Sequence, residues 1–368
     1  MTTIKLNDLK RLPINHEREQ QVIREVHQSG YYVHGPHHAA FEQEFAAWCG
    51  VRHAVGVASG TDALELALRA IGVTAGSLVA TVANAGGYTT CAILAIGAVP
   101  VYVDVNKSLT MCPEHLDSVL KANSGIQAVV VTHLYGRLAH MAQLSPIIRS
   151  AGCQLLEDCA QAHGASDGQT KAGAFGDAAA FSFYPTKNLG AVGDAGAVVT
   201  SDDHVMDRLR LLRQYGWRTR YTSELPGGRN SRLDEIQAAV LRCRLPLVDH
   251  WNQRRREILE QYRRRSHKTA LEFPGGDGAD CVAHLAVAQH PQRSAFQAVL
   301  DQHGVETAIH YPLLDTMQPA WQSQLTRKSL PLSEYATNRI VTLPCHPGMT
   351  DFEVEMVCRA IEATETGR

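Results

Sequence analysis

The decisive stretch of this chain is Phe181-Ser182-Phe183-Tyr184-Pro185-Thr186-Lys187-Asn188-Leu189-Gly190. It places a lysine just past an apolar run, in a turn of small and polar residues. A second apolar run ends upstream at Asp158, within Leu155-Leu156-Glu157-Asp158-Cys159-Ala160-Gln161. If both runs are strands of one sheet, the amine of Lys187 and the carboxylate of Asp158 lie at the same edge of that sheet.

Apolar runs and helical stretches alternate along the chain from residue 54 onward. Such alternation predicts an α/β fold with a large, mostly parallel sheet covered by helices on both faces. In sheets of this kind ligands bind outside the carboxyl ends of the strands, where Asp158 and Lys187 are expected. The predicted strands are 54–58, 78–82, 99–103, 127–132, 153–157, 178–183 and 196–200, and the predicted helices include 16–28, 39–49, 62–72, 87–96, 113–122 and 140–150.

A second domain is expected toward the C-terminus. A long helical segment runs from about 231 to 264 and contains Pro246, which should kink or break it. We therefore predict a large domain over residues 1–246, including an N-terminal arm, and a smaller α+β domain over residues 247–368. The smaller domain is expected to contain strands at 282–288 and 306–310, a loop at 273–278 and a last helix at 351–364.

Composition narrows the class of protein. The chain has 368 residues and a formal net charge of −2, so it is long enough for two domains and gives no reason to expect nucleic acid or an anionic membrane surface as a partner. Its nine cysteines are scattered without a CxxC pair, which argues for a reducing compartment and against a zinc site. No apolar run approaches the ~20 residues of a membrane span. We expect a cytoplasmic protein without a metal.

Asp158 and Lys187 together indicate a pyridoxal 5'-phosphate site. A carboxylate at the end of an apolar strand is costly to desolvate without a partner, and a protonated pyridine nitrogen supplies one. Lys187 would bind the cofactor covalently and then act as the base for a 1,3-proton shift. Gln161 would donate a hydrogen bond to the ring oxygen. Taken singly, Asp158 is also typical of a loop cap and Lys187 of a surface turn.

The segment Val55–Leu64 predicts a phosphate site, because it runs from a strand through a glycine turn into a helix. Gly60 would let the backbone approach the ligand, Thr61 would add a hydroxyl, and the helix N-terminus attracts an anion. An ordinary helix cap is the alternative for this segment. Ser182 would point toward the same phosphate, and Tyr88 is the candidate ring to stack on the cofactor, unless it is a structural tyrosine.

With these residues in place, the chain resembles the DegT/DnrJ/EryC1/StrS family of sugar aminotransferases, which have the fold-type-I architecture of aspartate aminotransferase. The resemblance covers nearly the whole chain. It implies a homodimer with shared active sites, in which Asn230 reaches the partner's cofactor phosphate. His163 and Arg232 lie in matching motifs near the active site and are candidate substrate residues, as is Tyr31, for which ordinary packing is the alternative. The motifs that carry it are Ser59-Gly60-Thr61, residues 157–165, residues 182–190, residues 230–239 and His310-Tyr311-Pro312.

The resemblance also implies the reaction. L-glutamate would give its amino group to the cofactor, leaving 2-oxoglutarate and pyridoxamine phosphate, and a keto sugar would then take the group. The expected acceptor is a nucleotide-linked 3-keto-6-deoxyhexose; a 4-keto nucleotide sugar, a cyclitol ketone and a keto sugar acid remain alternatives. A non-catalytic regulatory protein that binds the cofactor is the alternative from another class. One departure from the family pattern is Arg229, which stands where an aromatic residue is common.

Overall fold

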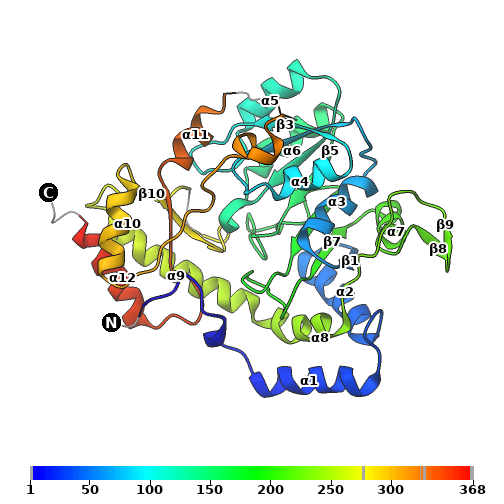
Figure 1. The fold of residues 1–368 in the computed structure, drawn as a ribbon, viewed down its shortest axis with the longest axis horizontal. Helices are drawn as coiled ribbons and strands as arrows, with labels where there is room; N and C mark the ends of the chain where they lie inside the picture. Colours follow the sequence, from blue (N-terminus) through cyan, green and yellow to red (C-terminus); the bar gives the residue numbers. More distant parts are fainter. Residues whose placement is uncertain (1–2, 276–277, 324, 326–328, 365–368) are drawn as a thin grey trace.

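The computed structural model describes residues 3–275, 278–323, 325 and 329–364, and its centre is a seven-stranded sheet (Figure 1). The strand order is β1-β7-β6-β5-β4-β2-β3, in which β7 runs antiparallel to its two neighbours and every other pair is parallel. The predicted mostly parallel sheet is confirmed. Its strands are β1 (His53–Val57), β2 (Leu78–Val82), β3 (Val99–Val103), β4 (Ile126–Thr132), β5 (Gln154–Asp158), β6 (Ala178–Ser182) and β7 (Gly196–Thr200).

Helices cover both faces of the sheet, because successive strand residues point in opposite directions. In β4, Val129 and Val131 belong to one apolar cluster, whereas Ala128 and Val130 belong to another on the opposite face. The first cluster includes residues of α2 (Pro36–Cys49), α5 (Pro113–Ala122), α6 (Met141–Ser150) and α8 (Glu235–Arg244), and the second includes residues of α3 (Gly60–Ala70), α4 (Tyr88–Ala95) and α7 (Asp203–Leu212). A further helix, α1 (His16–Ser29), packs on α8.

The predicted break at Pro246 is confirmed. Helix α8 ends at Arg244, the 3-10 turn η3 (Leu245–Leu247) contains the proline, and α9 (Val248–Ser266) follows. The proposed division of the chain at residues 246 and 247 stays a prediction. Residues beyond it build a separate apolar cluster together with Ile4, although Val248 and Trp251 pack into the cluster of the central sheet.

The C-terminal region, residues 248–364, is the part that the sequence described least well. Its two-stranded antiparallel sheet pairs β10 (Ala286–Gln289) with β11 (Ile340–Leu343), so the predicted strand at 282–288 begins later than expected. The predicted strand at 306–310 is wrong, because only Ala308 pairs, in a single bridge to Thr342. Its helices are α10 (Arg293–Gln302), α11 (Pro331–Thr337) and α12 (Asp351–Ala363), the last as predicted.

Smaller elements complete the fold. The hairpin of β8 (Trp217–Thr219) and β9 (Thr222–Ser223) was not predicted, and neither were α7, α10, α11 and β11. In the predicted loop at 273–278, residues 273–275 have no helix or strand, and 276–277 lie outside the described residues. The short 3-10 helices are η1 (Leu9–Arg11), η2 (Leu134–Gly136), η4 (Asp315–Met317) and η5 (Pro319–Trp321). Within the described ranges, no helix combines the length and the apolar character needed to cross a bilayer.

An aromatic cluster supports the strand that leads to Lys187. The ring of Phe45 on α2 stacks on Phe41 at a centroid distance of 5.4 Å. It also meets Phe181 and Phe183 edge-on at 5.0 and 5.1 Å. All four side chains are fully buried. Edge-to-face contacts of this kind add to the stabilisation that comes from area burial alone.

Phe45→Ala should lower the free energy of unfolding by ~3–5 kcal/mol, because it removes a fully buried ring and leaves a cavity against β6. Urea denaturation followed by circular dichroism measures the change. The matched control is Phe352→Ala, at a side chain that is 73% exposed on α12, which should change stability by less than ~0.5 kcal/mol. Equal effects of the two substitutions would contradict the role of the cluster.

Candidate active site

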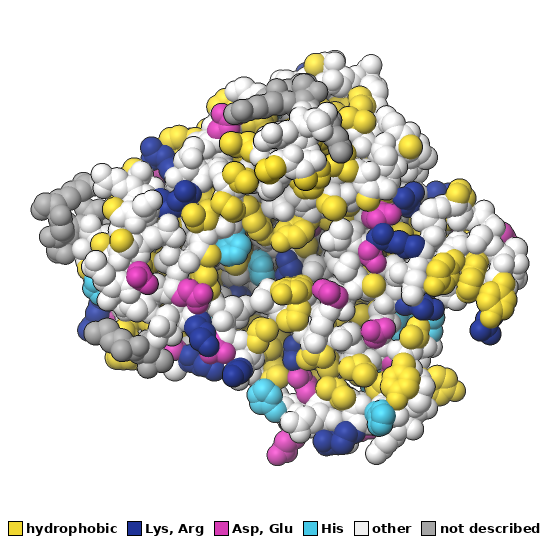
Figure 2. All heavy atoms as spheres, in the orientation of Figure 1, with side chains coloured by type: hydrophobic (Ala, Val, Ile, Leu, Met, Phe, Trp, Pro, Cys, Tyr) yellow, Lys and Arg dark blue, Asp and Glu magenta, His cyan; other side chains and the backbone are white. Residues whose placement is uncertain are grey.

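A cavity of about 480 Å³ opens at the carboxyl ends of β4, β5 and β6, where Thr132, Asp158 and Ser182 end their strands. Figure 2 shows a hollow near the centre of the molecular face, with histidine and basic side chains inside it. The residues lining the cavity are Leu6, Asn7, Ser59, Gly60, Thr61, Leu64, Ala85, Tyr88, Thr132, Leu134, Asp158, Ala160, Gln161, Ser182, Tyr184, Thr186, Lys187, Asp194, His284, Leu285, Ala308, His310, Tyr311, Leu343 and Cys345.

The carboxylate of Asp158 is 5% exposed and is held by donors from three segments. Its Oδ2 accepts hydrogen bonds from the hydroxyls of Thr89 (3.0 Å) and Thr132 (3.4 Å), and its Oδ1 accepts one from the backbone N–H of Ala160 (3.2 Å). Thr89 comes from the first turn of α4, so the carboxylate is fixed by two neighbouring strand ends and a helix. A fixed carboxylate at the cavity wall suits a cationic ring nitrogen as its partner.

The amide of Gln161 has a defined orientation. Its Oε1 accepts from the backbone N–H of Tyr135 (2.7 Å), and its Nε2 donates to the hydroxyl of Tyr311 (2.9 Å). Tyr311 belongs to the His-Tyr-Pro segment at 310–312, and the hydroxyl of Tyr135 in turn donates to the carbonyl of His310 (2.6 Å). The sheet edge and the C-terminal region are therefore joined directly beside the cavity.

Lys187 lies in a tight loop after β6. Its backbone N–H donates to the carbonyl of Tyr184 (2.8 Å), and the loop closes on itself because residue 190 is glycine: a Cβ there would collide with the carbonyl oxygen of Pro185. The amine Nζ makes no hydrogen bond or ion pair with any described residue. Burial lowers the pKa of Lys187 to about 8, although the negative charge of Asp158 opposes this shift.

The N-terminus of α3 also lines the cavity. The side chain of Ser59 caps the helix by accepting from the backbone N–H of Asp62 (3.1 Å). A Cβ at residue 60 would lie only 2.5 Å from the Cβ of Ser182, so glycine is what lets α3 approach the end of β6. Thr61 and Ser182 place hydroxyls on the same wall. A cradle of backbone N–H groups and hydroxyls at a helix N-terminus fits a phosphate.

The departure at Arg229 has a structural explanation. Its guanidinium pairs with the carboxylates of Asp62 and Glu65, both on α3, the latter at 2.9 Å. Ser231 also donates to Asp62 (2.6 Å). Arg229 therefore offsets the negative charge that Asp62 brings to the phosphate-facing turn of the helix, and it does not line the cavity.

The predicted site residues divide into two groups. Gly60, Thr61, Tyr88, Asp158, Gln161, Ser182 and Lys187 all line the cavity, whereas His163, Asn230, Arg232 and Tyr31 do not. Tyr88 is 52% exposed, and its ring meets Tyr311 edge-on at 6.1 Å.

The four residues outside the cavity lie in different surroundings. Asn230 and Tyr31 are on the surface of the chain, and Arg232 is partly buried. His163 is fully buried behind β6 against Phe181. Burial, together with the charge of Lys187, lowers the pKa of His163 to about 3 and keeps it neutral.

Several residues at the cavity were not predicted. His284 is buried, and its Nδ1 contacts the amide oxygen of Asn188 (3.0 Å), whose amide nitrogen donates to Asn252 (2.7 Å). The residue that follows Lys187 is therefore anchored to the C-terminal region. Burial and the charge of Lys187 hold the pKa of His284 well below its ordinary value. Leu6 and Asn7 from the N-terminal arm also line the cavity.

A buried group of His133, Glu157 and Cys159 lies beneath the site. His133 Nδ1 accepts from the backbone N–H of Ala139 (3.1 Å), so its Nε2 carries the proton and donates to Glu157 (2.9 Å). Glu157 also accepts from three backbone N–H groups of residues 173–176. Because both ring nitrogens of His133 are engaged, the group is a hydrogen-bonded support for β5 rather than a metal site.

The fold and the lysine–carboxylate cavity define an aminotransferase of the α/β class. Its sequence places it more closely: the chain belongs to the DegT/DnrJ/EryC1/StrS aminotransferase family, whose profile matches residues 13–362. The family comprises enzymes that depend on pyridoxal phosphate.

Relatives match almost the full chain. One is the "Erythromycin biosynthesis sensory transduction protein EryC1" of Saccharopolyspora erythraea, 40% identical over 93% of this chain and 94% of its own. Another is the "dTDP-3-amino-3,6-dideoxy-alpha-D-galactopyranose transaminase" of Aneurinibacillus thermoaerophilus, 40% identical over 96% of this chain and 97% of its own.

Solved structures agree with the fold. S. venezuelae DesV in complex with a ketimine intermediate has a TM-score of 0.93 and 37% identity, covering 99% of this chain and 98% of its own. NtdA from Bacillus subtilis, with bound cofactor PMP, has a TM-score of 0.93 and 26% identity, covering 100% and 86%. The predicted fold class is confirmed by these structures.

In the protein freed of cofactor, the amine of Lys187 should titrate near pH 8, because burial disfavours its charged form. Asp158→Asn should lower this midpoint, since the carboxylate charge raises the pKa of Lys187. The measurement is the pH dependence of amine labelling, read by mass spectrometry at the peptide that contains Lys187. Lys187→Ala is the control that assigns the signal, and an unchanged midpoint in Asp158→Asn would contradict the coupling.

Proposed function

We propose that this chain uses pyridoxal 5'-phosphate to transfer the amino group of L-glutamate to a nucleotide-linked keto sugar. The observation that carries the proposal is the convergence of Lys187, Asp158 and the α3 N-terminus on one cavity. The residues fit the cofactor: an unpaired amine, a hydrogen-bonded carboxylate and a helix N-terminus lined with hydroxyls match its aldehyde, its pyridine nitrogen and its phosphate. When bound, the cofactor supplies an electron sink for the carbanion that forms at the substrate Cα.

Each side chain has a defined task in this proposal. Asp158 keeps the pyridine nitrogen protonated, and its bonds to Thr89 and Thr132 keep it in place. Gln161 and Tyr88 also line the cavity, where Gln161 would donate to the ring oxygen and Tyr88 would stack on the ring. Thr61, Ser182 and the first N–H groups of α3 bind the phosphate.

Lys187 holds the cofactor and then carries the proton. A pKa of about 8 leaves a substantial fraction of the amine neutral at physiological pH. Lys187 can therefore take a proton from the substrate Cα and return it two atoms further along, which is the 1,3-proton shift. Burial lowers the pKa values of His163, His284 and His310, which lie around Lys187. They therefore remain neutral and add no positive charge beside it.

The walls of the cavity support a neutral sugar ring as the acceptor. Among the described residues that line the cavity, Lys187 is the only lysine or arginine, so one chain offers no second cation for a sugar carboxylate. Beside His284, His310 and Tyr311, the C-terminal region contributes an apolar part of the walls, made of Leu285, Ala308, Leu343 and Cys345. This lining suits a 6-deoxy sugar, and the similarity to a dTDP-3-amino-3,6-dideoxy-galactopyranose transaminase supports a 3-keto acceptor.

One relative is named a sensory transduction protein, which raises the regulatory alternative. A protein that only binds the cofactor does not need a base whose pKa is tuned toward neutrality. The proposed test therefore separates binding from turnover.

Glutamate should bleach the absorbance of the bound cofactor, and one member of a panel of keto compounds should restore it. The panel holds 3-keto and 4-keto nucleotide sugars, cyclitol ketones and keto sugar acids. Lys187→Ala should retain the cofactor but lose at least ~10³-fold in both half-reactions, since it removes the base and the covalent anchor. Bleaching without recovery by any panel member would overturn the sugar acceptor, and no bleaching would overturn the aminotransferase.

We also propose that the enzyme is a cytoplasmic homodimer with shared sites. The β8–β9 hairpin projects from the body of the chain (Figure 1) and carries packed aromatic rings: Trp217 lies 4.8 Å from Tyr215 and 5.3 Å from Tyr221, which is 73% exposed. Exposed aromatic patches of this kind are typical of partner surfaces. Asn230 is exposed and bridges to Gln214 beside this hairpin. The nine cysteines are all free thiols, which suits a reducing compartment.

Complementation tests whether Asn230 acts across the interface. Asn230→Ala and Lys187→Ala proteins should each be impaired alone. Purified heterodimers should have about half the activity of wild type, because one of their two sites combines an intact Lys187 with an intact Asn230 from the other subunit. Asn230→Ala mixed with wild type is the control, and absence of recovery would contradict a shared site.

A further inference from the structure

The N-terminal strap, residues 4–12, is built into the C-terminal region. Ile4 forms a parallel bridge to Val305, donates to the carbonyl of Gly304 (2.8 Å) and accepts from the N–H of Glu306 (3.0 Å). Its side chain is buried in the apolar cluster of the C-terminal region. Leu6 N–H donates to the carboxylate of Glu306 (3.0 Å). The first residues of the strap therefore behave as an added edge of this region.

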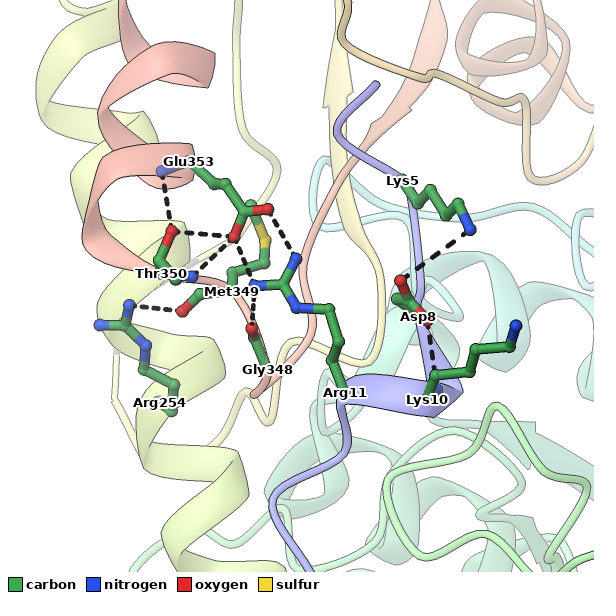
Figure 3. A network of polar contacts seen from close by, with 9 residues as sticks. All are labelled: Lys5, Asp8, Lys10, Arg11, Arg254, Gly348, Met349, Thr350 and Glu353. Atoms are coloured by element: carbon green, nitrogen blue, oxygen red, sulfur yellow. Dashed lines mark hydrogen bonds and ion pairs between the residues drawn. The ribbon is translucent and has the colours of Figure 1, made fainter. Parts of the chain in front are cut away.

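A clamp holds the far end of the strap (Figure 3). The guanidinium of Arg11 bonds both carboxylate oxygens of Glu353, at 2.6 and 2.7 Å, and also the carbonyl of Gly348 (2.6 Å). Glu353 is itself fixed by the capping box with Thr350 at the start of α12. The hydrogen bond from Arg11 has the largest effect on the carboxyl group of Glu353, and those from Thr350 add to it. Together they lower the pKa of Glu353 to about 2. A two-point fork of this kind fixes direction as well as distance.

The strap also lies directly on the backbone of the C-terminal region. Glycine at 348 leaves room for it, because a Cβ there would collide with the carbonyl oxygen of Arg11. Between the bridge at Ile4 and the clamp at Arg11, the carbonyl of Leu6 accepts a long hydrogen bond from the N–H of Cys345 (3.4 Å). The strap is thereby attached before, at and after the residues that reach the cavity.

Leu6 and Asn7 are those residues. Leu6 joins Leu343 and Cys345 on the apolar wall. The carboxamide of Asn7 makes no hydrogen bond with any residue in the described part of the chain, and Asn7 lines a cavity in which His284 is bonded to Asn188 and His310 to Thr342. An amide offers two donors and an acceptor, which matches a sugar hydroxyl.

We propose that the strap is the acceptor-facing wall of the active site: Asn7 hydrogen-bonds a hydroxyl of the keto sugar, and Leu6 packs against the sugar's apolar face. This inference rests on the proposed function. Glutamate and the sugar must both react beside Lys187, but the sugar with its nucleotide is much larger and extends further along the cavity. The elements that would hold the cofactor belong to the central sheet, whereas the strap belongs to the C-terminal region. Asn7 therefore acts on the second half-reaction and not on the first.

Asn7→Ala should raise the KM for the acceptor about 5- to 10-fold, the loss of one hydrogen bond to a neutral group, and leave the rate of bleaching by glutamate unchanged. The acceptor is the panel member with the highest kcat/KM for the wild type, and the nucleotide-linked 3-keto sugars are assayed first. Lys10→Ala, at an exposed position of the same strap, should match wild type in both half-reactions.

Arg11→Ala tests the strap apart from Asn7. It should give the same acceptor-specific rise in KM, with faster proteolysis near the N-terminus, while Arg11→Lys should recover part of the effect because it keeps the charge but loses the fork. Acceptor kinetics of Asn7→Ala equal to wild type, or equal losses in both half-reactions, would overturn the inference while the proposed function stands. A wild type that bleaches but accepts no panel member would overturn the proposed acceptor, and the inference with it.

Discussion

The rest of the site depends on the burial of one amine and one carboxylate at the same sheet edge. Desolvation pushes the pKa of Lys187 down, and the charge of Asp158 pushes it back up, so the balance falls near 8. Another cation nearby would lower the pKa of Lys187 further. The histidines around the amine have lowered pKa values and stay neutral, which leaves Lys187 as the titrating cation of the cavity. Fixed donors to Asp158 complete the arrangement, because they hold its charge at one place.

The cavity is assembled from two parts of the chain with different tasks. Strand ends and the N-terminus of α3 supply the groups that suit the cofactor, and the C-terminal region with the strap supplies the opposite wall. Asn188 joins the parts, since it follows Lys187 and bonds to both Asn252 and His284. An enzyme that accepts two unlike substrates in turn benefits from this division. The groups that suit the cofactor lie at strand ends and at the start of α3, whereas the proposed acceptor wall comes from the C-terminal region and the strap.

The sequence predicted the site residues that directly follow a strand. It missed those that reach the cavity only through tertiary contacts. The seven strands were found because their apolar runs end at small or polar turns, and the residues after β5 and β6 followed from them. The run at 306–310 looks like a strand, but it pairs at one residue before the chain turns into the cavity. Asn7 could not be found by pattern, because nothing in a polar residue near the N-terminus indicates Lys187, 180 positions later. His284 was missed for the same reason.

Arg229 shows how a departure from a family pattern can preserve its electrostatics. The first turn of α3 carries Asp62, whose negative charge would repel a phosphate at the same helix end. Arg229 and Ser231 both bind that carboxylate, so the charge is turned away from the cavity and offset there. The same contacts attach the loop that carries Asn230 to α3, while Asn230 itself remains exposed. A guanidinium in place of an aromatic ring thus keeps the helix end attractive to an anion and holds the neighbouring asparagine at the surface of the chain.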